Sequence, residues 1–166
     1  PKEDRELRRK LRGLDRAQVD GLSAFLYAGV TRQLTSMGMD LRVERDIATE
    51  LPEHRPLQGA YLRRQVKDIE PHFLPEIASI CPEHVYAAST AMNLVLADEA
   101  ADLAGVEPGP LFRSSPHRPL GRRLREILRS TSEQGYAGDR LVTDAWAREL
   151  GLGGWYAWVP FETPER

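Results

Sequence analysis

The feature that most constrains the fold is a long run of apolar residues at helical spacing, which follows a clear signal for a helix start. Asp15 and Gln18 stand three residues apart, as in a capping box, and Leu14 and Val19 bracket them as a hydrophobic staple. Gly38 then provides a residue suited to a left-handed helix end. Between these signals, apolar residues recur every three or four positions: Val19, Leu22, Leu26, Val30, Leu34 and Met37. We therefore predict one amphipathic helix from about residue 15 to residue 38.

The same spacing predicts helices along most of the chain. Before the long helix, Leu7, Leu11 and Leu14 indicate a short amphipathic one. After it, prolines and glycines delimit the other predicted helices: 56–70, which Pro71 ends, a short piece after Pro75, 83–103, 118–134, and 139–150, capped by Asp139 and stopped by Gly151. The 83–103 segment is the most apolar and contains many small residues, so we expect it to be the central helix.

Three segments do not follow this pattern. In 39–55, Met39, Leu41 and Val43 alternate as in a strand, whereas Val43 and Ile47 fit a helix, so both remain open. The segment 105–117 is rich in proline and glycine and predicts an irregular connection. The tail 151–166 is aromatic and β-prone, so it is expected to be short and extended.

Composition places these elements in one globular domain. The chain has 166 residues, of which 41% are hydrophobic and 29% charged, a balance that suits one core. We predict a mainly α, single-domain bundle of six or seven helices with a short aromatic C-terminal tail. Its parts are an N-terminal helical pair (1–38), middle helices (39–104), the connection (105–117) and a final part with the arginine-rich helix, last helix and tail (118–166).

Two observations bear on the compartment. Cys81 is the single cysteine, which excludes an intramolecular disulfide and favours a reducing cytoplasm. The longest weakly polar run, 87–97, is shorter than the roughly 20 residues that span a bilayer, so no membrane partner is expected.

The strongest functional signal is the arginine-rich stretch 113–130. On the predicted helix, four arginines recur at positions that share one face, opposite an apolar face: Arg118, Arg122, Arg125 and Arg129 against Leu120, Leu124, Ile127 and Leu128. We call these four the arginine face. Together with Arg113, His117 and the N–H groups of the helix start, it predicts a site for phosphate or an acidic partner.

The arginine face admits a second interpretation, a solvated helix surface neutralised by Glu133 and nearby acids. The binding interpretation predicts a binding or regulatory module for an anionic partner, either a nucleic acid or an acidic protein. The formal net charge of -2 and the pI near 6.1 require any nucleic-acid binding to come from this local cluster. The segment 142–154 has the turn of a helix-turn-helix, but aromatics and Pro160 follow where base-reading side chains belong. Homo-oligomerisation stays open.

The same stretch offers an enzyme alternative. Arg118 and Gly121 match a motif of Gln or Arg, two residues, Gly, one residue, then Gly or Ala, and the chain departs from it at Arg123. In this motif, and in a last helix before an aromatic segment, the final third of the chain resembles the acetyl-CoA-dependent N-acetyltransferases. The resemblance implies an acyl-CoA-dependent N-acyltransferase in which the 113–123 loop forms a pyrophosphate cradle.

No catalytic residue, cofactor or metal ion is assigned from the sequence, because strong catalytic signatures are absent from it. The four histidines, His54, His72, His84 and His117, never stand three or four residues apart. A metal site remains open only if separate helices converge, drawing on His72, Glu76, His84, Asp98, Glu99 or Asp102. Paired acids, Glu50 with Glu53 and Glu99 with Asp102, resemble those of all-α nucleotide pyrophosphohydrolases, which implies Mg²⁺; acids on an exposed helix face are the alternative.

Overall fold

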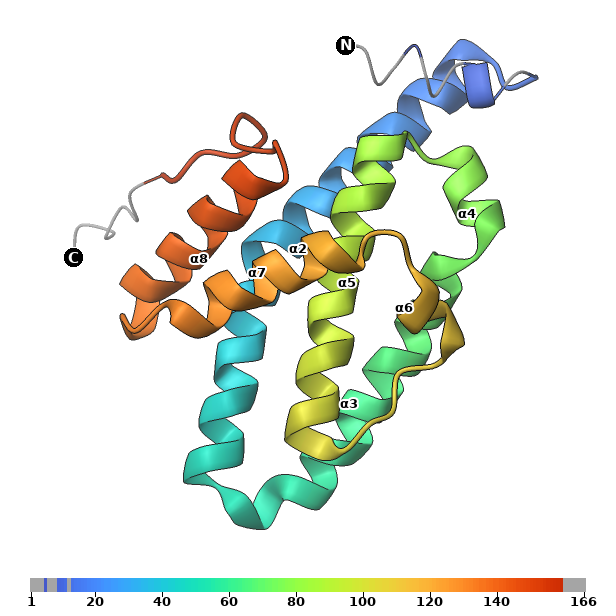
Figure 1. The fold of residues 1–166 in the computed structure, drawn as a ribbon. Coiled ribbons are helices and arrows are strands. Elements are labelled where there is room, and N and C mark those ends of the chain that lie inside the picture. Colours follow the sequence, from blue (N-terminus) through green and yellow to red (C-terminus); the bar gives the residue numbers. More distant parts are fainter. Residues whose placement is uncertain (1–4, 6–8, 12, 160–166) are drawn as a thin grey trace, which may run out of the picture.

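The structure is a computed structural model that describes residues 5, 9–11 and 13–159, and it confirms the mainly α fold. The described residues form seven α-helices and two 3₁₀ helices, with no β-strand among them (Figure 1). In chain order these are α2 (Arg16–Glu50), η1 (Pro52–His54), α3 (Arg55–Ile69), η2 (Glu70–Phe73), α4 (Pro75–Ile80), α5 (Glu83–Ala104), α6 (Pro110–Ser114), α7 (Arg118–Ser130) and α8 (Gly135–Glu149). Leu7 of the predicted first helix and the tail beyond residue 159 lie outside the described residues.

The first long helix, α2, begins as predicted but does not end at Gly38. Asp15 accepts a hydrogen bond from the Gln18 N–H at 2.8 Å, and Gln18 Oε1 accepts one from the Asp15 N–H at 2.9 Å, which confirms the capping box. The helix continues to Glu50, so the ambiguous segment 39–55 is helical over most of its length. Gly38 is buried against α8, where an added Cβ would lie 2.8 Å from Cγ1 of Val142. The glycine permits close approach of two helices instead of ending one.

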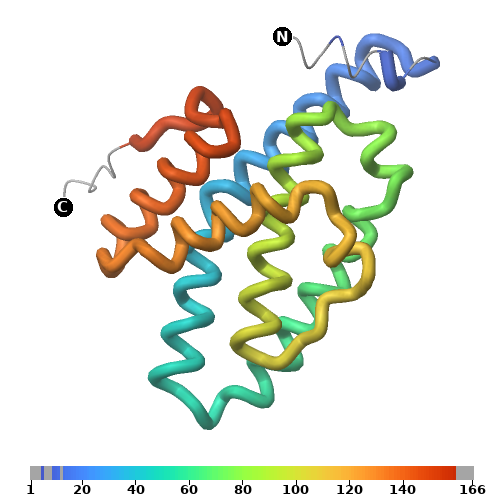
Figure 2. Tube along the Cα trace, in the orientation of Figure 1, coloured from blue at the N-terminus to red at the C-terminus, as the bar shows by residue number. Residues whose placement is uncertain are grey.

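The predicted central helix is confirmed as α5. Its neighbours are α7, α2 and α3, and Figure 2 shows its trace running between those of α2 and α3, with α7 crossing it. The residues buried along α5 belong mainly to the core and include Val85, Ala88, Ala91, Met92, Leu94, Val95, Leu96, Ala97 and Ala100. Because so many of them are small or apolar, three helices approach α5 closely from different sides.

The connection 105–117 contains one short helix that the sequence did not predict, α6. It is only five residues long, too short for a periodic apolar pattern to be visible. Phe112 is buried there against Phe73 of η2, with ring centroids 4.4 Å apart. This aromatic contact joins the connection to the core.

The boundary between the last two helices also differs from the prediction. α7 ends at Ser130, and α8 begins at Gly135, one turn before the predicted cap at Asp139. Asp139 instead forms an ion pair with Arg42 of α2 at 3.4 Å, which accounts for an acid near the start of α8. Gly151, with φ of 69°, follows the end of α8 as expected.

The aromatic tail 151–159 contains no strand and folds back on the helices. Trp155 lies edge-on to Tyr27 of α2, with ring centroids 4.7 Å apart. Tyr156 and Trp158 donate hydrogen bonds to Oδ1 of Asp144 on α8, at 2.6 Å and 2.8 Å. The predicted extension of this segment is therefore replaced by an irregular turn held by side chains. Across the described chain, no helix combines the length and the apolar character needed to cross a membrane.

Candidate functional site

The arginine face is presented by α7 because the opposite side of this helix packs into the core. Pro119 occupies the first turn, where its missing N–H costs no hydrogen bond. Leu124 and Leu128 are fully buried, and the buried indole of Trp146 donates to the Leu124 carbonyl at 2.8 Å. With these contacts fixed, arginines three and four residues apart are directed along the flank of α5.

Acids on α5 pair with most of the arginine face. Asp98, Glu99 and Asp102, which we call the α5 carboxylates, lie within one helical turn. Arg118 binds Asp98, with nitrogen–oxygen distances of 3.2 Å and 3.3 Å. Arg125 Nε donates to Glu99 Oε1 at 2.7 Å, and its Nη2 donates to Asp102 Oδ2 at 2.6 Å. Each of these two arginines is therefore anchored to the neighbouring helix.

Glu99 is the centre of the cluster and has no exposed surface. Its Oε1 also accepts a hydrogen bond from Arg129 Nε at 2.9 Å, and its Oε2 accepts one from Arg45 Nε of α2 at 2.8 Å. Arg129 additionally donates to Asp102. Three arginines from two helices thus surround one buried carboxylate, and the charge of Glu99 is compensated in a place where an isolated charge would be very costly.

The electrostatics agree with this geometry. Burial by itself raises the pKa of Glu99, but hydrogen bonds from Arg125, Arg45 and Arg129 outweigh it and hold that pKa below its ordinary value. The hydrogen bond from Arg129 is the main cause that lowers the pKa of Asp102. The cluster is therefore built for ionised acids and charged arginines.

Arg122 is the exception on the arginine face. Its side chain is exposed, and within the described chain it has no ion-pair partner. Glu126, one turn later, is also exposed and pairs with none of the described arginines. Arg122 therefore differs from Arg118, Arg125 and Arg129 in pointing its charge to solvent.

The remaining predicted site residues lie at or before the start of α7. Arg113 donates to the Pro108 carbonyl at 2.9 Å, within its own connection. His117 is half-buried, with its ring edge-on to Tyr86 at a centroid distance of 5.6 Å. Burial lowers the pKa of His117, and the charge of Glu83 acts in the opposite direction. The structure thus brings Arg118, Arg125 and Arg129 together with α5 but does not draw Arg113 into that cluster.

The sequence did not predict the acids that neutralise the arginine face or the contribution of Arg45. Glu133, the acid named as a neutraliser, uses its backbone carbonyl to accept a hydrogen bond from Arg42. The signal that could have been used is the spacing of Asp98, Glu99 and Asp102, which places charge on an otherwise apolar helix.

Gly121 packs against α5 instead of lining an open loop. An added Cβ would lie 3.0 Å from Leu94 Cβ and 3.3 Å from the Ala91 carbonyl oxygen. The approach of α7 to α5 accounts for this glycine, and the described residues after α8, up to 159, form no strand, so neither feature of the N-acetyltransferase resemblance gains support here.

The candidate metal ligands do not assemble. In the described parts of the chain, no group of three or more His, Cys, Asp and Glu side chains could hold a metal ion. His72 contacts Asn93 at 3.3 Å, His84 faces Trp155, and Glu99 and Asp102 are taken by arginines. Pairing with arginine accounts for Glu99 and Asp102 without Mg²⁺.

Comparison of this chain with models of protein families, with curated proteins and with solved structures gives no match.

Proposed function

We propose that the chain is a binding or regulatory module that recognises an acidic segment of a partner protein through the outer edge of the arginine face. The observation that carries the proposal is the arrangement around Glu99. This buried carboxylate holds Arg125 and Arg129 through their Nε atoms, and Asp102 binds their Nη2 atoms, so the Nη1 atoms of both arginines are engaged by none of the described residues. Arg122 is exposed beside them on the same helix face.

Pre-organisation is the physical reason why such an arrangement favours binding. A flexible surface arginine loses side-chain entropy when it grips a ligand, whereas Arg125 and Arg129 are already ordered by the α5 carboxylates. The side chain of Arg129 is 42% exposed and that of Asp102 is 50% exposed, so a carboxylate of a partner can reach the same guanidinium group. Guanidinium groups carry five N–H donors each, more than the α5 carboxylates engage.

The charge balance favours a protein partner over a nucleic acid. Arg45 and the arginine face together outnumber the α5 carboxylates by two, and exposed Glu126 reduces this excess to one. The whole chain carries a formal charge of -2. A polyanion needs a broad positive surface, whereas one or two acidic side chains can be bound by a local pair such as Arg122 and Arg129.

The test uses Arg122, because its replacement leaves the Glu99 cluster intact. Fluorescence anisotropy with a labelled oligo-glutamate peptide measures binding at low and moderate salt, with a short DNA duplex as the competing class of ligand. We expect wild-type protein to bind the peptide in a salt-dependent manner and Arg122→Glu to weaken this binding about tenfold, equivalent to about 1.4 kcal/mol.

The matched control is Arg148→Glu on α8, an exposed arginine that has no ion pair with the described residues and undergoes the same charge change. It should retain the affinity of the wild type. Absence of peptide binding, or equal losses in the two variants, would overturn the proposal. Tighter binding of the duplex than of the peptide would overturn the choice of a protein partner.

A further inference from the structure

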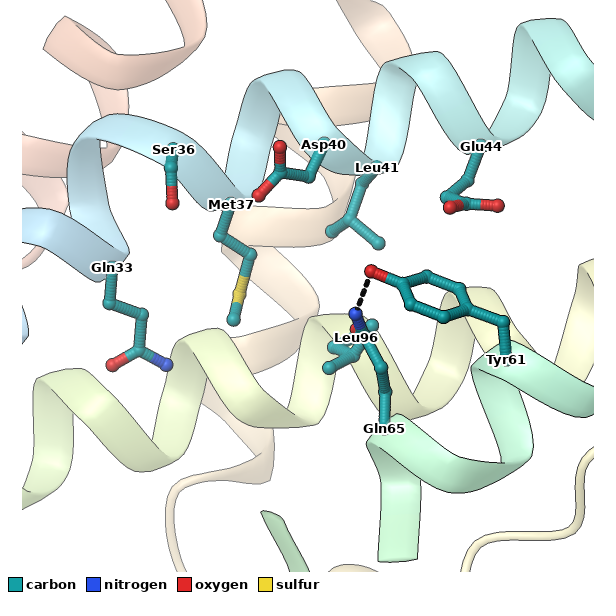
Figure 3. Close-up of a pocket in the computed structure, with 9 residues that line it drawn as sticks. All are labelled: Gln33, Ser36, Met37, Asp40, Leu41, Glu44, Tyr61, Gln65 and Leu96. Atoms are coloured by element: carbon teal, nitrogen blue, oxygen red, sulfur yellow. Dashed lines mark hydrogen bonds between the residues drawn. The ribbon is translucent and has the colours of Figure 1, made fainter. Parts of the chain in front are cut away.

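A small pocket lies on another side of α5, between α2 and α3. The pocket has a volume of about 80 Å³ (Figure 3). It is lined by Gln33, Ser36, Met37, Asp40, Leu41, Glu44, Tyr61, Gln65 and Leu96. This volume is small beside the roughly 300–1,000 Å³ of a pocket for a drug-sized ligand, so it suits a short, narrow ligand.

The walls of the pocket differ in chemistry. On α2, Asp40 and Glu44 are one helical turn apart on the face that borders the pocket. On α3, Tyr61 and Gln65 are joined by a hydrogen bond from the Gln65 amide to the Tyr61 hydroxyl, drawn dashed in Figure 3. Apolar side chains complete the lining: Met37, Leu41 and Leu96.

The two carboxylates have no cationic partner. Asp40 forms no side-chain hydrogen bond or ion pair with the described residues, and no lysine, arginine or histidine lines the pocket. One oxygen of Glu44, Oε2, accepts a hydrogen bond from buried Gln58 at 2.8 Å, which fixes that carboxylate at the pocket. Glu99 and Asp139, which lie at other helix contacts, are paired with arginine, whereas exposed Asp40 and half-buried Glu44 pair with no arginine of the described chain.

We infer that this pocket binds a short primary alkylamine in its ammonium form. The ammonium group has three donors for the carboxylates of Asp40 and Glu44, and the face of the Tyr61 ring adds cation–π attraction. The alkyl stem would contact Met37, Leu41 and Leu96. A metal ion would find two carboxylates at this pocket but gain nothing from its apolar lining, which is why an organic cation fits better.

Methyl NMR of methionine tests this site with internal controls, since the chain has three methionines. Met37 lines the pocket, Met92 is fully buried, and Met39 is exposed on α2 outside the pocket lining. In protein labelled at the methionine methyl carbons, titration with n-butylamine should shift the Met37 signal saturably. The Met39 and Met92 signals should stay in place. The neutral isostere n-butanol should leave Met37 unchanged.

Variants separate the pocket from general charge effects. Asp40→Asn/Glu44→Gln should weaken n-butylamine binding at least about tenfold, since both charges that attract the ammonium are removed. The matched control, Asp46→Asn/Glu50→Gln, removes two exposed acids at the same spacing on α2 and should bind like the wild type. The Met92 signal at its native position confirms that each variant is folded.

Three results would overturn the inference. These are an unmoved Met37 signal, an equal response to n-butanol, and equal affinities in the pocket variant and its control. A Met37 shift caused as strongly by Ca²⁺ as by n-butylamine would replace the organic cation with a metal ion and would also overturn it.

Discussion

Arg125 donates a hydrogen bond of 2.7 Å to Glu99, which is fully buried on the neighbouring helix. This contact joins α7 to α5, and Arg45 brings α2 to the same carboxylate at 2.8 Å. A single side chain therefore ties three helices together. Most of the arginine face is consequently part of the internal structure as well as of the proposed binding surface.

Replacement of Glu99 should destabilise the protein. Glu99→Gln keeps the size of the side chain but removes the charge that compensates Arg45, Arg125 and Arg129. We expect the free energy of unfolding to fall by about 2–3 kcal/mol, measured by urea denaturation. Asp46→Asn, which alters an exposed acid, should change it by less than about 0.5 kcal/mol. Equal effects of the two substitutions would show that the cluster does not stabilise the fold.

Gly121 should be intolerant of a branched side chain because α7 lies against α5 at this point. Gly121→Val would force atoms into Leu94 and the Ala91 carbonyl, and we expect a loss of about 2–3 kcal/mol in urea denaturation. Gly29→Val on α2 is the control, since nothing lies within 4 Å of a Cβ added there. A Gly121→Val protein as stable as the control would contradict the close packing of the two helices.

The lowered pKa of His117 predicts a loss of stability on acidification. Burial favours the neutral imidazole in the folded protein, so the unfolded chain binds the proton more readily. The contribution of His117 to the free energy of unfolding is complete above the pKa of about 6.5 that this side chain has in the unfolded chain. It is lost as the pH falls through the lower pKa of the folded protein. Urea denaturation between about pH 7 and pH 5 should show this decline in the wild type.

His117→Gln should reduce the slope of stability against pH in that range, whereas His54→Gln, at an exposed position, should preserve it. An unchanged slope in His117→Gln would assign the decline to other groups.

The contact of Tyr156 with Asp144 predicts that this tyrosine ionises at a higher pH than an ordinary tyrosine. Burial and the hydrogen bond to Asp144 raise the pKa of Tyr156 to about 12. Its stabilising contribution is therefore present below the ordinary tyrosine pKa of about 10 and is lost as pH rises through the folded value. Ultraviolet titration of tyrosinate should show a late step that is missing in Tyr156→Phe. In Asp144→Asn this step should move to lower pH, and a step that stays in place would exclude Asp144 as a cause.

Local sequence signals predicted the helix starts and ends that are set by residues close to one another in the sequence. The capping box of Asp15 and Gln18 determined where α2 begins, and Pro119 and Gly151 marked the start of α7 and the end of α8. Such signals act within one or two helical turns, so they need no knowledge of the rest of the fold.

The predictions that failed concern residues whose role depends on a distant partner. Glycine is a residue type common at helix ends, but Gly38 lies inside α2, where Val142 of α8 packs against it. Aspartate is a residue type common at helix caps, but Asp139 forms an ion pair with Arg42 instead. α6 is held by the contact of Phe112 with Phe73, which are far apart in the sequence. In each case a residue type suited to a local role serves a tertiary contact.

The sequence by itself determined a helical chain and the common face of Arg118, Arg122, Arg125 and Arg129, because the period of an α-helix is a local property. Only the tertiary structure decided that three of these arginines meet α5 carboxylates while Arg122 remains exposed. It likewise decided that Asp40 and Glu44 border a pocket without a cation. The register between packed helices sets which charges meet, and that register depends on the fit of many side chains across the whole core.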